Sequence, residues 1–392
     1  MSEIKQHPNH ENLERLGEFV DDVRERSRIV GEIQHLEPVD IEFGTTHRYG
    51  FQTEAGYLYA ANVTIPHKQT TDISVLSTGA WGTSTRGHNE NTGADLAELG
   101  IPFIHVGNEG SYHPWGIPPI PKRGLTLVGS AGAALAFSEE VTKRDFPYLL
   151  HPELRTAIGE SKGGMEGMAL PTLASAFGQK ILMADFTATC MPKKPSIKEL
   201  FQFGDQLVRG ETIGAARLAG RLAVDVLAHM PSTIDLNPYA FAHQVAKGPA
   251  IFSGEAGDLS RLLDENFVLH KTIFKGDGWS MVEEWVKIFG GSSNVRINQL
   301  DGIHLTIADP ETKTFVMSRQ MAFRDLYEQN DRRQQDQDGN ELFSGQDIWN
   351  LAHEYYNQCA KALPGGMIQT VIRLAVGGNN RLHRDLTEPK AA

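Results

Sequence analysis

The stretch that decides the fold is LRTAIGESKGG, residues 154–164. Its first part, LRTAIG (154–159), has the β-prone composition of a strand, and an apolar helix is expected to follow it. Between the two, Gly159, Ser161 and Gly163 fit the pattern G-x-S-x-G. A serine on a tight strand-to-helix turn stands out above the C-terminal edge of a sheet, and small neighbours permit the strained backbone. The stretch therefore predicts a nucleophilic serine, although an ordinary glycine-rich turn would carry the same letters.

Outward from this stretch, β-prone and helical segments alternate. Strands are expected at 39–43, 57–66, 72–78, 101–107 and 180–186, and helices at 91–99 and 127–144. Strands separated by helices predict a parallel sheet with crossover helices on both faces. The β-rich opening stretch predicts antiparallel strands at the start of this sheet, a mixture that large α/β sheets commonly show.

The two ends and one internal segment have a different texture. A helix is expected over 12–34 and another over 345–363, whereas 190–247 has no convincing strand but a strong helix at 212–230. Strands return at 248–254 and 294–300. The predicted organisation is a helical extension (1–38), a core (39–189 and 248–325), a helical cap (190–247), and a C-terminal helix and tail (326–392).

Composition excludes several classes of function. The 392 residues carry a net charge of −12, which argues against nucleic acid and anionic membrane surfaces as partners. The two cysteines, Cys190 and Cys359, are too few for a disulfide framework or a cysteine zinc site. The N-terminal residues show no apolar leader, and no stretch approaches the ~20 apolar residues of a membrane span. We therefore expect a cytoplasmic protein.

In motif and in chain order, roughly residues 39–325 resemble the α/β-hydrolase superfamily. That family places its catalytic triad in the order nucleophile, acid, histidine. The resemblance implies that Ser161 is the nucleophile and that a histidine follows the last core strand. His304, in the segment Asp301-Gly302-Ile303-His304, resembles the Gly-x-His loop of the family. Of the other histidines, His270 and His353 are expected on helices and His105 within a strand.

The resemblance also implies the position of the acid. The family usually carries it in the loop after the strand that precedes the histidine strand. With 248–254 as that strand, the loop is Gly254-Glu255-Ala256-Gly257-Asp258, and Asp258 is the expected acid. Glu255 is the next candidate. Asp185, at the end of the strand 180–186, corresponds to a position that some lipases use instead.

Two backbone amides are expected to form the oxyanion hole. The resemblance implies the amide of Lys162, which follows the nucleophile, and an amide from the loop after the third family strand. Here that loop begins Ser77-Thr78-Gly79-Ala80-Trp81, with Thr78 where the family has a histidine. Ala80 is the expected second donor, and Trp81 is the next candidate and a substrate contact.

No cofactor or metal is expected. The glycine-rich segment 106–111 contains neither G-x-G-x-x-G nor a Walker lysine, so it does not predict a phosphate site. The histidines and glutamates between 88 and 113 lack H-E-x-x-H or any comparable metal-ligand spacing.

The predicted reaction is hydrolysis of a carboxylic ester or related acyl bond through an acyl-enzyme. The substrate is expected to be a small acyl ester, apolar because the cap would roof the site and because Phe201 and Phe203 would line it. An acyltransferase using the same triad and a non-catalytic binding protein on the same fold are the alternatives. The oligomeric state stays open, a homo-oligomer included.

Overall fold

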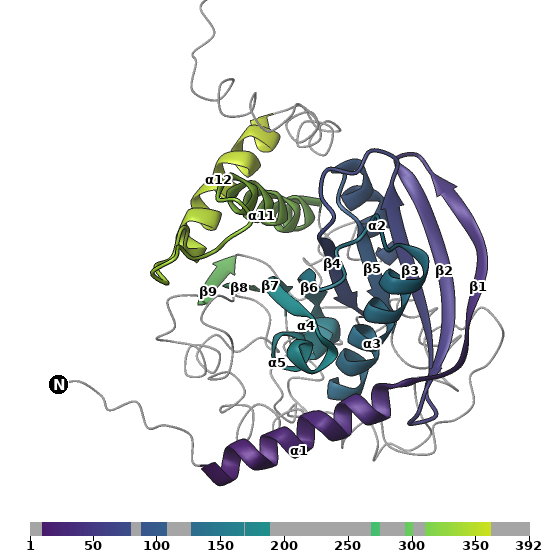
Figure 1. Ribbon diagram of the computed structural model, residues 1–392. Helices are drawn as coiled ribbons and strands as arrows, with labels where there is room; N and C mark the ends of the chain where they lie inside the picture. Colours follow the sequence, from purple (N-terminus) through teal and green to yellow (C-terminus); the bar gives the residue numbers. More distant parts are fainter. Residues whose placement is uncertain are drawn as a thin grey trace, which may run out of the picture.

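The computed structural model describes residues 10–79, 88–107, 127–167, 169–188, 268–274, 295–300 and 310–361. Within them, nine strands form one sheet in the order β1-β2-β3-β5-β4-β6-β7-β8-β9, with helices on both faces (Figure 1). The strands are β1 (Ile29–Ile41), β2 (Gly44–Thr53), β3 (Leu58–Pro66), β4 (Ser74–Thr78), β5 (Phe103–Val106), β6 (Leu154–Glu160), β7 (Lys180–Thr187), β8 (Val268–Phe274) and β9 (Val295–Leu300). The helices are α1 (His10–Ser27), α2 (His88–Glu98), α3 (Leu127–Asp145), α4 (Ser161–Gly167), α5 (Leu170–Ala174), the short 3-10 helix η1 (Ser175–Phe177), α11 (Pro310–Gln329) and α12 (Gly345–Lys361).

The strand directions confirm the predicted mixed sheet. β1, β2, β3 and β5 pair antiparallel in that order. From β5 onward every pair is parallel, through β4, β6, β7, β8 and β9. The expected strands at 57–66, 72–78, 101–107, 154–159 and 180–186 are present as β3, β4, β5, β6 and β7.

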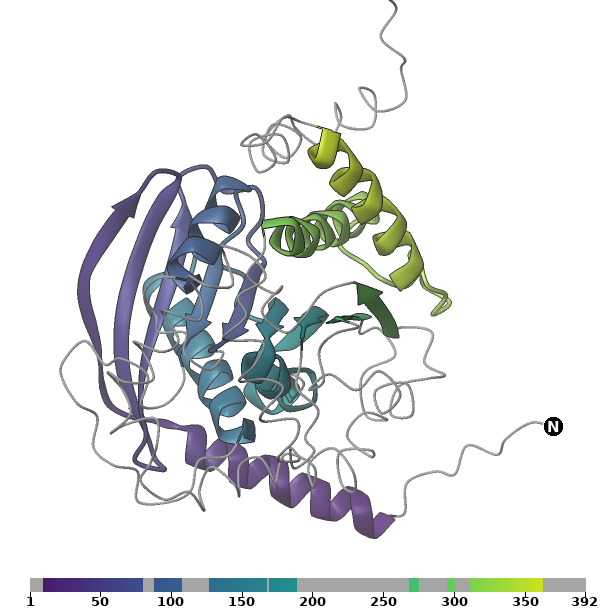
Figure 2. The same ribbon diagram turned by 180° about the vertical axis from the view of Figure 1, so that it is seen from behind.

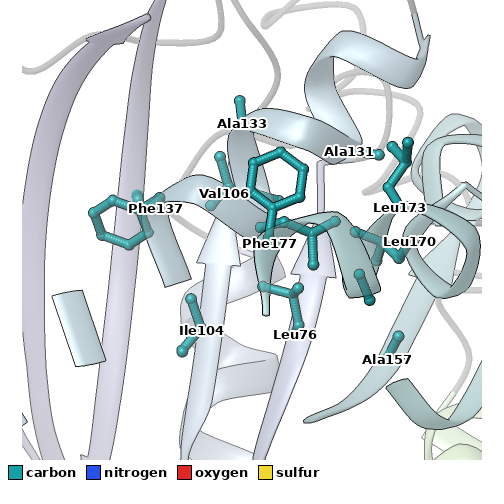
Figure 3. Close-up of a cluster of buried hydrophobic side chains, with 14 of the residues drawn as sticks. Leu76, Ile104, Val106, Ala131, Ala133, Phe137, Ala157, Leu170, Leu173 and Phe177 are labelled. Carbon is teal, nitrogen blue, oxygen red and sulfur yellow. The ribbon is translucent and has the colours of Figure 1, made fainter. Parts of the chain in front are cut away.

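The two faces of the sheet bury separate hydrophobic clusters because successive strand residues point to opposite faces. Leu76, Ile104 and Ala157 pack with α1, α3 and α5 on one face (Figure 3). Their neighbours along the strands, Val75, Phe103 and Ile158, pack with α2, α11 and α12 on the other face. Figure 2 shows the same layers from behind. The central strands are therefore covered on both sides, as their apolar composition requires.

The helix expected over 12–34 is wrong at its C-terminal end. α1 ends at Ser27, and the chain continues as β1, which pairs with β2. Gly31, within β1, adopts a φ of +74°, a left-handed conformation that favours glycine, and it lies in the first of two register shifts between β1 and β2. β1 forms one edge of the described sheet, and its register with β2 shifts between Val30 and Gln34 and again between Leu36 and Val39.

The second half of the sheet contains a strand that the sequence pattern did not predict. β8 (Val268–Phe274) pairs directly with β7 and with β9, and all seven of its residues are buried. His270 therefore lies on a strand, and its expected helix is wrong, whereas His353 lies on α12 and His105 on β5 as predicted. The expected cap at 190–247, its helix at 212–230 and the expected strand at 248–254 lie outside the described residues.

Candidate active site

The predicted strand-to-helix turn is confirmed at the centre of the sheet. β6 ends at Glu160, and α4 begins at the next residue, Ser161. β6 pairs with β4 on one side and β7 on the other, so the turn lies at the carboxyl edge of the parallel strands. Ligands of open α/β sheets bind outside this edge. The backbone of Ser161 thus has the position that a nucleophile on this kind of turn requires.

Glycines allow α4 to approach the sheet this closely. A Cβ atom on Gly159 would lie 2.8 Å from the carbonyl oxygen of Gly163 and 2.9 Å from the Cα of Gly164. A Cβ atom on Gly167 would lie 2.4 Å from the ring of Phe186 on β7. Real Cβ atoms essentially never come so close, so Gly159, the first glycine of the G-x-S-x-G pattern, has a steric cause in this turn.

The loop after β4 starts beside this turn. Thr78, the last residue of β4, donates a hydrogen bond from Oγ1 to the carbonyl oxygen of Gly163 at 2.8 Å. The next amide, that of Gly79, donates to the carbonyl oxygen of Val106 at 3.0 Å. Because the Gly79 amide is already bonded to Val106, it is not available to an oxyanion.

Most predicted site residues lie outside the described part of the chain. The structure describes only the backbone of Ser161 and Lys162. The predicted site residues that lie outside the described ranges are Ala80, Trp81, Phe201, Phe203, Glu255, Asp258 and His304. β9 ends at Leu300, at the same carboxyl edge of the parallel strands as β6, and His304 is four residues further along the chain.

The sheet order changes the expectation for the acid. Within the described residues, the strand that pairs with β9, which precedes His304 in the chain, is β8, and β8 ends at Phe274. The chain after β8 reads Lys275-Gly276-Asp277-Gly278. Asp277 is therefore a candidate that the sequence analysis missed, and it lies outside the described residues, like Asp258. The sequence signal for Asp277 is a mostly apolar run followed by a Gly-Asp-Gly segment. The buried polar residues of β8 interrupt that run, so it was not recognised as a strand.

Asp185, the third candidate for the acid, has a different role in the described structure. Its Oδ1 accepts a hydrogen bond from Nη2 of Arg319 on α11 at 2.7 Å, and its Oδ2 accepts from Nε of the same guanidinium. Neither side chain of this ion pair is exposed. Burial raises the pKa of Asp185 to about 6, and the Arg319 charge opposes that rise. Both carboxylate oxygens are thus committed to anchoring α11 to β7.

His270 lies beside this ion pair. In the sheet register it stands opposite Asp185 on β7 and Arg296 on β9. Its ring stacks at a centroid distance of 6.4 Å on Trp349 of α12, whose ring also contacts the Arg296 guanidinium at 4.6 Å. Burial, together with the charges of Arg319 and Arg296, holds the pKa of His270 well below its usual value. Within the described residues, neither ring nitrogen has a hydrogen-bond partner.

Two further properties of the described residues concern metals and membranes. No group of three or more His, Cys, Asp or Glu side chains among them has the arrangement of a metal site. None of the helices in the described ranges is both long enough and apolar enough to cross a bilayer.

The antiparallel opening strands, the parallel remainder and the serine turn after the central strand define the α/β-hydrolase fold, so the predicted fold class is confirmed. No protein-family model and no curated protein sequence matches this chain.

Solved structures with a similar trace include several titled esterases. Acetyl xylan esterase 1 from Thermoanaerobacterium has a TM-score of 0.43 at 10% identity, over 74% of this chain and 86% of that one. An acetyl xylan esterase from Paenibacillus has a TM-score of 0.45 at 10% identity, over 76% and 91%. Carboxyl esterase 2 from the fungus Tuber melanosporum has a TM-score of 0.42 at 12% identity, over 79% and 84%. At these identities and TM-scores the similarities assign no activity to this chain.

Proposed function

We propose that this chain is a serine hydrolase that cleaves a carboxylic ester through an acyl-enzyme on Ser161. The observation that carries the proposal is the turn itself, in which Ser161 begins α4 directly after the central strand β6. The close contact of Gly159 with the backbone of Gly163 supports it, because a tight strand-to-helix turn has a clear use in presenting a nucleophile.

In the proposed mechanism, His304 accepts the proton of the Ser161 hydroxyl as the oxygen attacks the acyl carbon. The amides of Lys162 and Ala80 stabilise the oxyanion of the tetrahedral intermediate. His304 then protonates the leaving alcohol, and a water molecule, deprotonated by His304, releases the acyl group. No cofactor takes part.

For the acid that orients His304, we propose Asp277 ahead of Asp258. The family order places the acid after the strand next to the histidine strand, and in this sheet that strand is β8. Asp277 is the third residue after β8 ends. Asp185 is the weaker candidate because both of its oxygens are bonded to Arg319.

The substrate is proposed to be a small ester with an apolar acyl group. Trp81, Phe201 and Phe203 supply aromatic surface near the site, the last two from the proposed cap at 190–247. Each buried methylene contributes about 0.8 kcal/mol. We expect kcat/KM to rise with acyl length over a series of p-nitrophenyl esters before it falls.

Labelling with a fluorophosphonate probe, followed by ester hydrolysis, tests the nucleophile. Ser161→Ala is expected to remain folded, to escape labelling, and to lose about 10⁴-fold or more of the turnover. Ser175→Ala, at an exposed serine of η1, is the matched control and should behave like the wild type. Labelling of Ser161→Ala, or a Ser161→Ala variant that retains a tenth of the wild-type turnover, would exclude Ser161 as the nucleophile.

A pair of variants tests the acid. Asp277→Asn is expected to lower kcat by about 10³–10⁴-fold, because an amide in place of the carboxylate imposes the wrong imidazole tautomer. Asp258→Asn is its matched control. If Asp258→Asn causes the large loss and Asp277→Asn does not, the acid belongs to the earlier loop.

A further inference from the structure

The two proposed oxyanion donors lie on different segments of the chain. The Lys162 amide belongs to the first turn of α4, and the Ala80 amide to the loop after β4. An oxyanion hole works only when both donors stand about 2.7–3.1 Å from the developing charge. The separation of these two segments must therefore be fixed by contacts between them or with their neighbours.

The direct pairing between β4 and β6 stops before it reaches Thr78 and Ser161. The ladder between β4 and β6 ends at the pair Ser77 and Ile158, one residue before Thr78 and three before Ser161. On its far side, the loop after β4 is held by the hydrogen bond from the Gly79 amide to Val106 on β5. On the side of the nucleophile, it is the Thr78 hydroxyl that continues the connection.

The Thr78 contact joins the two segments directly. Its Oγ1 donates to the carbonyl oxygen of Gly163 at 2.8 Å, across 85 positions of sequence. The Thr78 side chain is 3% exposed, so water does not compete for this bond. The acceptor lies one residue after Lys162 and is the same carbonyl that closely approaches Gly159.

We infer that Thr78 is a positioning residue, which sets the distance between the two oxyanion donors by tying the end of β4 to the first turn of α4. The inference rests on the proposed function. It gives a use to the position at which this chain departs from the His-Gly segment of the family, since the hydroxyl of Thr78 spans the gap to the nucleophile turn. Thr78 touches neither the substrate nor the reacting atoms in this role.

Thr78→Val removes the hydroxyl and keeps the branched shape. Because a misplacement of about 1 Å can cost about 10²-fold in rate, we expect kcat to fall about 10- to 100-fold with little change in KM. The rate of labelling by a fluorophosphonate should fall in parallel, since the probe forms a comparable oxyanion. Thr78→Ser restores a donor and is expected to recover most of the wild-type kcat.

The matched control is Thr64→Val. Thr64 lies on β3, with β5 between it and β4, and its Oγ1 is 3.1 Å from Oγ1 of Thr46 in an equally buried pair. Thr64→Val should lower the melting temperature about as much as Thr78→Val does and leave kcat unchanged.

Four outcomes would overturn the inference, the last of them together with the proposed function. One is an active wild type in which Thr78→Val keeps its kcat; another is a Thr64→Val that loses kcat equally. If Thr78→Val does not fold, Thr78→Ser and Thr64→Val decide alone. A Thr78→Ser variant with wild-type stability and wild-type kcat supports the inference. A Thr78→Ser variant with wild-type stability and a kcat reduced tenfold or more overturns it. A wild type that no fluorophosphonate labels would overturn the proposed function together with this inference, so the two failures are distinguishable.

Discussion

Two neighbouring residues of β7 show how differently the two faces of the sheet are joined to their helices. Phe186 faces α4, where Gly167 leaves no room for a single additional carbon atom. Asp185 faces α11, where the contact is an ion pair with Arg319 that is fully buried. The contact between Gly167 and Phe186 depends on volume. The contact between Asp185 and Arg319 depends on charge, so its strength varies with pH and with the pairing of its members.

The largest expected effect comes from removing one member of the buried pair. Arg319→Met should lower the free energy of unfolding by about 3–5 kcal/mol, because it leaves the Asp185 carboxylate buried without a partner. The double variant Asp185→Leu/Arg319→Met should recover most of this loss. Urea denaturation measures both. A double variant as unstable as the single one would show that the pair itself, and not an uncompensated charge, stabilises the junction.

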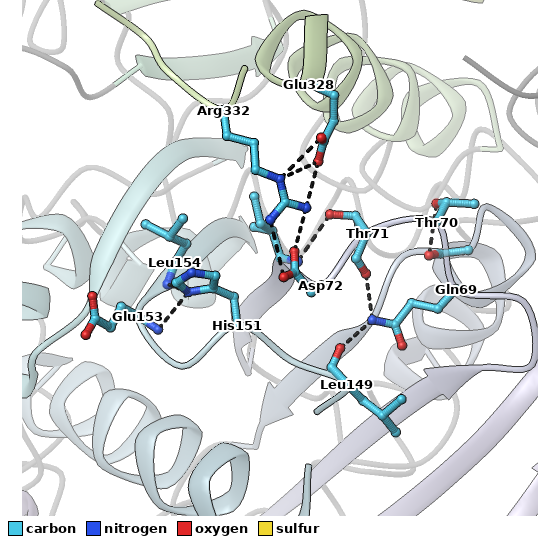
Figure 4. Close-up of polar contacts among 12 residues, drawn as sticks. Gln69, Thr70, Thr71, Asp72, Leu149, His151, Glu153, Leu154, Glu328 and Arg332 are labelled. Atoms are coloured by element: carbon cyan, nitrogen blue, oxygen red, sulfur yellow. Dashed lines mark hydrogen bonds and ion pairs between the residues drawn. The ribbon is translucent and has the colours of Figure 1, made fainter. Parts of the chain in front are cut away.

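An exposed ion pair of the same region is the control for this experiment. Arg332, just after α11, pairs with Asp72 at 2.8 Å and with Glu328 at 3.0 Å, and its side chain is 39% exposed (Figure 4). Asp72→Asn should cost less than about 1 kcal/mol, because water and salt screen exposed pairs.

A smaller effect is expected at the glycine junction. Gly159→Ala should cost about 1–3 kcal/mol and much of the activity, because its Cβ meets the backbone of Gly163. Gly167→Ala should cost a similar amount, but its Cβ meets the Phe186 ring, which a second change can remove. Phe186→Leu should therefore partly rescue Gly167→Ala and not Gly159→Ala. Equal rescue of both would mean that the turn is less tightly packed than these distances indicate.

The smallest effect concerns pH. Since the pKa of folded His270 is lowered, only the unfolded chain takes up this proton as the pH falls below about 6.5. The contribution of neutral His270 to stability is fully present above that pH and declines by up to about 1.4 kcal/mol per pH unit below it.

A non-titrating ring isolates this contribution. His270→Phe lacks it, so the stability difference between wild type and variant should shrink as the pH falls from 7 to 5. The raised pKa of Asp185, about 6, changes stability with pH in the opposite direction, because the folded state binds that proton more tightly. Wild type and variant share this effect, so it largely cancels in the difference between their stabilities. A difference that is constant with pH would show that the pKa of His270 is the same in the folded and unfolded protein.

The sequence predicted the parts of the fold that local patterns specify. The strand-to-helix turn was predictable because Gly159, Ser161 and Gly163 serve one local geometry. β8 was not, because His270 and Lys271 interrupt its apolar pattern although both are buried. Their burial depends on distant segments, among them α12, which supplies Trp349 to His270.

The same limit explains why Asp277 was not among the expected acids and why the first helix was expected to be longer. Without β8, the strand before the histidine strand was placed at 248–254, and Asp258 followed from that choice. At the other end of the chain, the apolar periodicity of α1 continued across Arg28 into residues that pair with β2. Strand pairing is a tertiary contact, and it overrode the local pattern there.

The irregular path of β1 bears on aggregation. A long strand at the edge of a sheet exposes unpaired backbone groups to which a second molecule can add a strand. Two register shifts interrupt the backbone of β1, and Pro38 lies within the second of them, between Leu36 and Val39. Glu32 and Glu37 on the same strand are exposed. A bulged, charged strand that contains a proline is a poor surface for intermolecular β-pairing, so this edge protects the protein against assembly into extended sheets.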